Sequence, residues 1–166
     1  MAILTFPNPK LRDTSIPVSE ITEEIRSIVR NNMIPALFSQ NAAGIAAPQV
    51  GHLLRIFLLD GKILPGGTDL SPAVVCINPK IVKVWGRKIS MEEGCLSFPG
   101  AFAKIVRPRG VQLQALDLDG KVFEIADEGF AARAILHEMD HLDGKLMIDH
   151  LKGEKRSKFI DKMSLV

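Results

Sequence analysis

His137-Glu138-Met139-Asp140-His141 places two histidines four residues apart, with a glutamate directly after the first. On an α-helix, residues four apart lie on one face, so both imidazoles can bind the same metal ion. An unligated carboxylate one residue along can reach a water molecule on that ion. The pattern therefore predicts a helix that carries a metal site, although a helix with two partly exposed histidines and an ion-paired glutamate would have the same sequence.

The sequence before this helix predicts one further helix and several strands. Apolar residues at helical spacing indicate a helix over residues 20–39, with Ser19 or Thr22 as its cap. The Asp119-Gly120 pair predicts a hairpin that leads into a strand at residues 122–125. Earlier runs rich in β-branched residues predict strands at residues 53–60, 73–77, 81–85 and 111–118.

The order of these elements predicts the fold class. The helix with the two histidines is expected to begin near residues 127–128 and to stop at Gly144, and a short C-terminal helix is expected from about Gly153. Strands grouped between helices favour an α+β fold, with antiparallel or mixed sheets packed around the central helix. The 166 residues are enough for one compact domain over residues 1–166.

Composition argues against two classes of partner. A net charge of +2 gives no broad electrostatic footprint for nucleic acid. No apolar run reaches the roughly eighteen residues of a membrane span, and Pro7 and Pro9 interrupt the place where a signal peptide would have its apolar core. We therefore expect a soluble, cytosolic protein, in which the basic residues 152–158 form a solvated helix face.

The two cysteines lie in different surroundings. Cys76 belongs to an apolar run typical of a buried strand, where cysteine acts as a small hydrophobe. Cys95 lies among glycines and a proline, which leave its thiol available to a partner. Cys95 is the natural third ligand for the two histidines, and three protein ligands leave a fourth position for water. The spare histidines are His52 and His150, and a structural role is expected for the latter.

Zinc peptidases are an alternative class with a similar helix. In the metzincin type the third ligand is a histidine six residues after the second, and Met147 occupies that position here. In a second peptidase pattern a glutamate on a following helix ligates the metal, but the chain after Glu154 is too short for that lobe. Cleavage of peptide bonds is therefore the weaker interpretation.

Three segments together make the chain resemble the peptide deformylases, the metalloenzymes that remove the formyl group from the initiating methionine of new polypeptides. Ala42-Ala43-Gly44-Ile45-Ala46-Ala47-Pro48-Gln49 matches the family's Gly-x-Gly-Φ-Ala-Ala-x-Gln, except that Ala42 replaces the first glycine. Glu93-Gly94-Cys95-Leu96-Ser97 and residues 137–141 match the second and third blocks. The resemblance extends from Phe6 to Leu151.

Two positions of the central helix bear on this resemblance. Leu136 stands where many members have glutamine. Arg133 falls on the metal-facing side of the helix and matches the branch that includes organellar members. We interpret Arg133 as a solvent-facing or ion-paired side chain, with a substrate contact as the alternative.

The resemblance implies a metal and its ligands. Cys95, His137 and His141 would hold one divalent ion per chain, Fe²⁺ in the cell, with Zn²⁺, Ni²⁺ or Co²⁺ possible in purified protein. Hydroxide on that metal would attack the formyl carbonyl. The bacterial cytoplasm is the implied location, and an organellar version would have the same features.

The resemblance also implies roles for three further groups. Glu138 would act as general acid and base, by taking the proton of the water and returning it to the leaving amine. The Gln49 side-chain amide and the Leu96 backbone N–H would donate to the oxyanion.

For the substrate, the resemblance implies formyl-methionyl nascent polypeptides and transient association with the ribosome. We expect the peptide backbone to add as an extended strand beside Gly44 and Ile45. Phe130, Ala134 and Ala43 are the predicted walls of the pocket for the methionine side chain, although each is also an ordinary core residue.

A binding role without catalysis is the second alternative. A metal-stabilised module, or a degenerate relative that binds nascent chains without turnover, would be supported only by the basic residues 152–158. A purely structural metal site gives no reason for Glu138 and Gln49 to be present. The residues therefore favour an enzyme.

Overall fold

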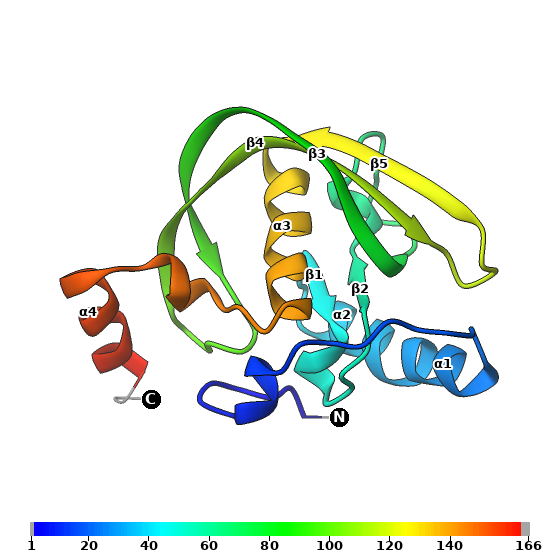
Figure 1. Ribbon diagram of the computed structural model, residues 1–166, viewed down its shortest axis with the longest axis horizontal. Coiled ribbons are helices and arrows are strands. Elements are labelled where there is room, and N and C mark those ends of the chain that lie inside the picture. Colours follow the sequence, from blue (N-terminus) through cyan, green and yellow to red (C-terminus); the bar gives the residue numbers. More distant parts are fainter. Residues whose placement is uncertain (1, 164–166) are drawn as a thin grey trace.

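The computed structural model describes residues 2–163 and is built on a five-stranded antiparallel sheet. Strands adjacent in sequence are neighbours in this sheet, in the order β1-β2-β3-β4-β5. With helices on the concave side of a curved sheet, the predicted α+β class is confirmed (Figure 1). The strands are β1 (Gly44–Ala46), β2 (Ile56–Leu59), β3 (Val74–Gly94), β4 (Phe102–Leu116) and β5 (Val122–Glu128).

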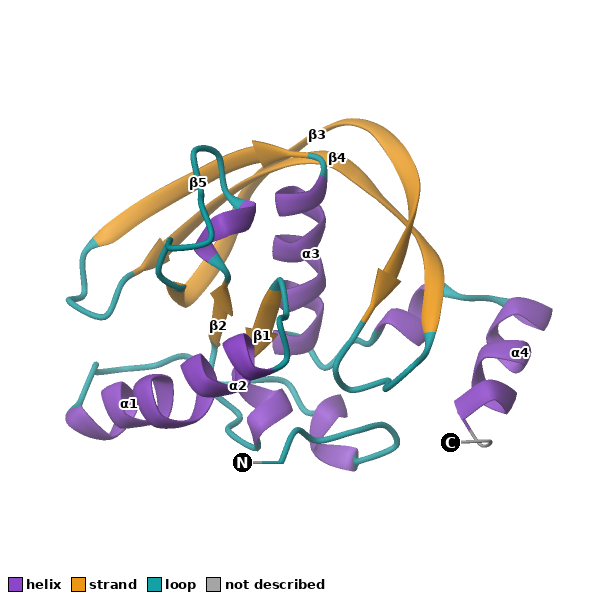
Figure 2. Ribbon diagram, turned by 180° about the vertical axis from the view of Figure 1, so that it is seen from behind, coloured by secondary structure: helices purple, strands orange, loops and turns teal. Residues whose placement is uncertain are grey.

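Strands β3 and β4 are longer than the sequence predicted. The segments 73–77 and 81–85 belong to one strand, β3, whose ladder with β4 is interrupted by register shifts, one of them between Ile81 and Lys83. Residues 86–94 and 102–110 extend the same hairpin, although charged residues are frequent in both segments. This extension forms an arch over the central helix, and it brings Cys95, directly after β3, to that helix (Figure 2).

Helix α3 (Phe130–Leu142) is the central helix and carries both histidines. The expected start at residues 127–128 is wrong, because these residues extend β5 and pair with Gly110 and Val111 of β4. Gly129, with φ of +70°, turns the chain out of the sheet and into the helix. Gly144, with φ of +67°, follows the helix end as predicted.

The N-terminal helix consists of three parts. They are α1 (Glu23–Ser27), a π-helical stretch (Ile28–Met33) and α2 (Ile34–Ser39), so helix formation over most of residues 20–39 is confirmed. The hydroxyl of Thr22 accepts from the Ile25 N–H and caps the first turn. The wider π turn precedes Pro35, which has no N–H to donate to a carbonyl in the preceding turn.

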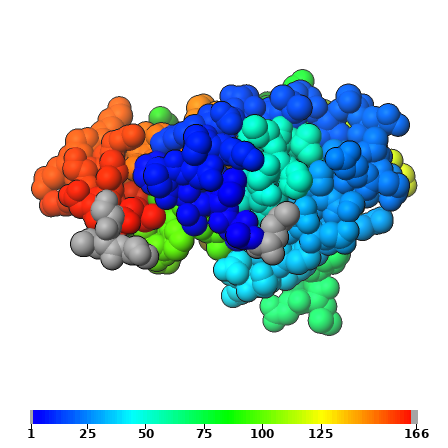
Figure 3. Space-filling view, turned by 90° about the horizontal axis from the view of Figure 1, so that it is seen from below, coloured from blue at the N-terminus to red at the C-terminus, as the bar shows by residue number. Residues whose placement is uncertain are grey.

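Helix α4 (Gly153–Met163) is the predicted C-terminal helix. Its Phe159 packs edge-on against Phe98, with ring centroids 5.4 Å apart. On the face shown in Figure 3, the N-terminal residues lie beside this helix. Among residues 2–163, no helix is long and apolar enough to cross a membrane.

Candidate metal centre

The three predicted ligands lie together in the structure. The ligand atoms of Cys95, His137 and His141 are within 4.8 Å of one another. The two histidines project from successive turns of α3, with ring centroids 5.0 Å apart, and Sγ of Cys95 lies 3.2 Å from Nε2 of His141. One thiol and two imidazoles form a donor set that suits zinc or a similar transition metal ion.

The surroundings of these donors favour their ligating forms. Burial opposes ionisation of Cys95, but His141 and His137 lower the pKa of this thiol well below its usual value. A thiolate is the form of cysteine that binds metals. Nδ1 of His137 lies 3.0 Å from Oε2 of Glu93, which leaves its Nε2 for a metal. The residues present therefore fit a divalent metal ion.

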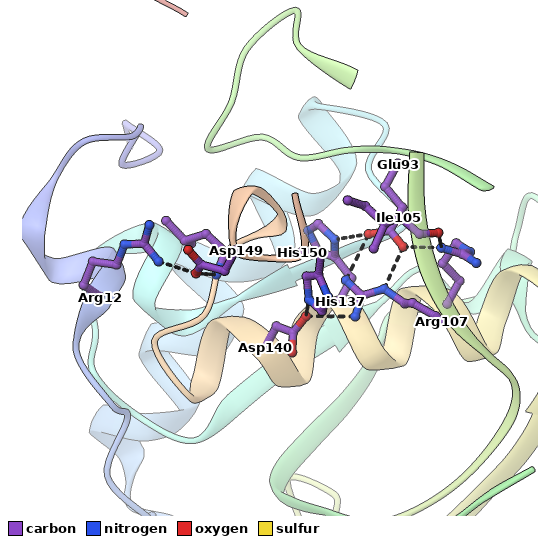
Figure 4. A network of polar contacts seen from close by, with 10 residues as sticks. Arg12, Glu93, Ile105, Arg107, His137, Asp140, Asp149 and His150 are labelled. Atoms are coloured by element: carbon purple, nitrogen blue, oxygen red, sulfur yellow. Dashed lines mark hydrogen bonds and ion pairs between the residues drawn. The ribbon is translucent and has the colours of Figure 1, made fainter. Parts of the chain in front are cut away.

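Glu93 is the main residue of the site for which no role was predicted. Its carboxylate accepts hydrogen bonds from Arg107 Nε and Nη2 at 2.7 and 3.0 Å and from Arg133 Nη1 at 2.6 Å, besides its contact with His137 (Figure 4). Burial alone would raise the pKa of Glu93, but the hydrogen bonds from His137 and Arg107 hold it far below its usual value. Glu93 is thus a buried carboxylate that fixes a ligand histidine.

Arg133 is ion-paired, as one of its two interpretations predicted, but it is buried instead of solvent-facing. Only 5% of the residue is exposed. Besides the ion pair with Glu93, it donates to the carbonyls of Ile105 and Ile89 at 2.9 and 2.7 Å. These bonds attach α3 to both strands of the arch.

Arg107 continues the network toward the surface. Its Nη1 donates to Oδ2 of Asp140 at 2.8 Å, and the same oxygen lies 2.7 Å from Nε2 of His150. The expected structural role of His150 therefore agrees with this hydrogen bond. Arg107 itself was missed, although a signal exists: it follows Ala103 and Ile105 at alternate, inward-facing positions of β4, where a charged residue needs a partner.

Glu138 lies beside the ligands and is only 4% exposed. Its Oε2 has no hydrogen-bond partner within residues 2–163. A Cβ atom on Gly44 would lie 2.7 Å from Oε1 of Glu138, so the glycine allows the carboxylate to approach the backbone of β1. Burial raises the pKa of Glu138 to about 7.

Gln49 is held in a fixed orientation beside Cys95. Its Oε1 accepts from the Ala46 N–H at 2.9 Å, while its Nε2 lies 3.1 Å from Ser97 Oγ and 3.6 Å from Cys95 Sγ. The side chain is buried, at 2% exposure. The amide N–H groups of Gln49 therefore face the metal ligands, next to Leu96 in the wall of the same cavity.

A cavity of about 860 Å³ opens in front of these groups. Ala43, Gly44, Phe130 and Ala134 line this cavity, and Phe130 is 55% exposed. Ile45 is different, because its side chain is fully buried in the core cluster that includes Val29, Met33 and Leu58. Strand β1 is an edge strand, so its outer side is not paired within the sheet.

Three comparisons with known proteins agree with this arrangement. The family model of polypeptide deformylases matches residues 1–157. A protein named peptide deformylase from Acinetobacter baumannii (strain SDF) is 37% identical over 166 residues, which are 100% of this chain and 91% of the relative. A peptide deformylase structure from Legionella pneumophila has a TM-score of 0.89 at 38% identity and covers 98% of this chain and 92% of its own.

A further solved structure was determined with a bound compound. A peptide deformylase from Synechococcus elongatus in complex with actinonin has a TM-score of 0.88 at 33% identity, over 99% of this chain and 86% of that one. Similarity at this level extends over the whole fold. This chain therefore belongs to the polypeptide deformylase family, and it is an enzyme of that family.

Proposed function

We propose that the protein hydrolyses the N-formyl group of N-terminal formyl-methionine on newly made polypeptides. The observation that carries the proposal is the position of Glu138. This carboxylate is buried and lies next to three convergent ligands, yet its Oε2 is unbonded to any described residue. A purely structural metal site has no need of such a group.

The proposed cofactor is one divalent ion on Cys95, His137 and His141, with Fe²⁺ as the ion in the cell. When bound, such an ion lowers the pKa of a coordinated water, so that hydroxide is available near neutral pH. Zn²⁺, Ni²⁺ or Co²⁺ would suit the same donors in purified protein.

Glu138 is proposed as the general acid and base. Its carboxylate would accept a proton from the attacking water and deliver it to the nitrogen of the leaving amine. A general base works best when its pKa lies near the operating pH. Burial of Glu138 raises its pKa in that direction, and the absence of a Cβ on Gly44 leaves room for the carboxylate beside β1.

The oxyanion of the tetrahedral intermediate needs hydrogen-bond donors that are already oriented. We assign this role to the side-chain amide of Gln49 and to the backbone N–H of Leu96. The bond from Ala46 N–H to Gln49 Oε1 supports the assignment, because it turns the NH₂ of this amide toward the ligands.

The substrate is proposed to lie along the free edge of β1. Main-chain hydrogen bonds to Gly44 and Ile45 would give affinity without a demand on peptide sequence. The first side chain would enter the cavity between Ala43, Phe130 and Ala134. A formyl carbon carries only hydrogen, so a narrow space at the metal would admit it and exclude larger acyl groups. Transient binding to the ribosome remains a prediction.

The test is release of formate from a short N-formyl-methionyl peptide by anaerobic, Fe²⁺-loaded protein, with Glu138→Ala measured beside the wild type. We expect formate from the wild type and at least about 100-fold less from the variant, since general acid–base groups contribute about 10²–10⁴-fold. An N-acetyl peptide serves as the substrate control and should not react. A wild type that binds one metal ion and releases no formate would refute the proposal.

A further inference from the structure

A series of side-chain contacts begins on α3, crosses both strands of the arch and returns to α3. It runs from His137 on α3 to Glu93 on β3, then to Arg107 on β4, and returns to α3 at Asp140. We call these four residues the ring. The three contacts measure 3.0, 2.7 and 2.8 Å, and Asp140 lies one helical turn after His137. The orientation of His137 therefore depends on groups from three elements.

His150 is the point where the ring meets the solvent. It comes from the 3₁₀ helix Met147–His150, and its Nε2 contacts the same Asp140 oxygen that accepts from Arg107. Side-chain exposure falls inward, from 31% at His150 to 18% at Asp140 and 5% at Arg107. His150 thus partly covers the outer ion pair of the ring and supplies a second donor to Asp140.

The ring acts on one of the two histidine ligands. Glu93 fixes the N–H of His137 on Nδ1, which presents the lone pair of Nε2 to the metal. His141 has no comparable partner, because its Nδ1 is buried and unbonded among the described residues. Buried polar networks strengthen one another when every member is satisfied. Release of Asp140 would remove one of the anchors of Arg107 and so loosen its hold on the Glu93 carboxylate, which Arg133 would still contact.

We propose that His150 is a positioning residue for the metal centre. Its hydrogen bond to Asp140 helps to hold the carboxylate that accepts from Arg107, and the ring slows escape of the metal by holding His137 in its ligating orientation. This inference rests on the metal site of the proposed function, but it concerns metal retention and not the reaction. Among the described contacts, His150 is the only donor from outside the ring to the Asp140 carboxylate.

The test uses Co²⁺, whose bond to the Cys95 thiolate gives a charge-transfer absorption. Protein loaded with one Co²⁺ is mixed with excess chelator, and the decay of this absorption is followed. Loss of a direct partner of a metal ligand costs about 10- to 100-fold in affinity. His150 lies three contacts beyond Glu93, the direct partner of His137, so His150→Leu should have a smaller effect and release cobalt about three- to tenfold faster. His150→Gln keeps a donor at the same distance from Cβ and should release cobalt at nearly the wild-type rate.

His52→Leu is the matched control, because His52 also has a single side-chain contact, Nδ2 of Asn32 at 3.1 Å, but lies outside the ring. Its cobalt release should equal that of the wild type. Equal rates for His150→Leu and the wild type would overturn the proposal, as would equal rates for the Leu and Gln variants. If His150→Leu fails to fold, His150→Ala takes its place and should give the same acceleration.

The outcome is separable from that of the formate assay. A wild type that retains cobalt and shows the predicted order of release rates, yet frees no formate, refutes deformylation and leaves the role of His150 standing. Formate release with no difference between the His150 variants refutes only the inference on His150. A wild type that takes up neither cobalt nor iron overturns both.

Discussion

Helix α3 is only thirteen residues long, but it has an apolar stripe and a polar stripe that contact very different surroundings. The apolar stripe packs among Phe57, Leu59 and Leu113 of the sheet, without polar partners. The polar stripe faces Glu93 and Arg107 of the arch. The apolar stripe consists of Ala132, Ile135 and Leu142, and the polar stripe of Arg133, His137 and Asp140.

The comparison separates what holds the helix from what orients the metal ligand. Apolar packing is not directional and tolerates small shifts, so the apolar stripe contributes stability. Charge-assisted hydrogen bonds are directional, so the polar stripe fixes angles and tautomers. A change on one stripe should therefore alter unfolding or metal retention, but seldom both equally.

Glu93→Ala should give the largest effect on stability. It leaves Arg107 and Arg133 buried, and breaking a buried ion pair from one side costs about 3–5 kcal/mol. The loss of the partner of His137 should also weaken metal binding by about 10- to 100-fold. Urea unfolding and metal titration measure the two. Glu92→Ala, at the exposed neighbour, is the control and should change neither. A Glu93→Ala protein as stable as the wild type would contradict this account of the polar stripe.

Ile135→Ala tests the apolar stripe alone. Ile135 is fully buried, and deletion of such a side chain costs about 2–5 kcal/mol. Ile135→Val should cost about 0.5–1.5 kcal/mol on the same scale. The rate of cobalt release at a temperature where both variants are folded should remain that of the wild type. Faster release in proportion to lost stability would show that the two stripes are not separable.

Gly44→Ala tests the space in front of Glu138. The added Cβ would lie 2.7 Å from Oε1, so the carboxylate has to move. A misplacement of about 1 Å in a catalytic group can cost about 100-fold, and we expect a 10- to 100-fold lower kcat for formate release. Metal content should stay at one ion per chain. Full activity in Gly44→Ala would argue against the assigned position of Glu138.

The smallest effect is expected at Asp149, which forms an ion pair at the surface. Partial burial would raise the pKa of Asp149, but Arg12 and the Leu146 N–H lower it below its usual value. The stabilisation is complete above pH about 4 and is lost as the pH falls through the folded-state pKa. Both side chains are about one third exposed, so it should stay below about 1 kcal/mol.

The measurement for Asp149 is the urea midpoint between pH 6 and 3, compared with that of Asp149→Asn. The wild type should lose its advantage only at the acid end of this range. A constant difference at every pH would mean that charge on Asp149 contributes nothing. The loss of unfolding free energy in Asp149→Asn can be compared with that in Glu93→Ala. The difference measures how strongly burial changes the contribution of an ion pair.

Local sequence patterns were sufficient to predict the elements that bury an apolar face. The helix over residues 20–39, the end of α3 after Leu142 and the strand that buries Cys76 all follow from local patterns. The arch, residues 86–94 and 102–110, could not be predicted in this way, because charged residues alternate along strands that have an exposed face. Its pairing depends on a partner strand and not on its own composition.

The cluster of candidate metal ligands could be predicted from the sequence, but the residues that support the cluster could not. The histidine spacing and Cys95 identify the donors, because the chemistry of these residue types is restricted. The partner of Arg107 and the role of Glu93 depend on contacts across 14 and 44 positions of sequence, which no local pattern encodes. The buried ion pair of Arg133 belongs to the same class, since it joins residues 40 positions apart.

The central claim is that one metal ion and Glu138 together remove a formyl group. Its most direct test is formate release from an N-formyl-methionyl peptide as metal-free protein is titrated anaerobically with Fe²⁺, for the wild type and Glu138→Gln. We predict that wild-type activity rises linearly and stops at one ion per chain, while Glu138→Gln binds the ion and stays inactive. Activity in metal-free protein, or equal activity in Glu138→Gln, would contradict the account.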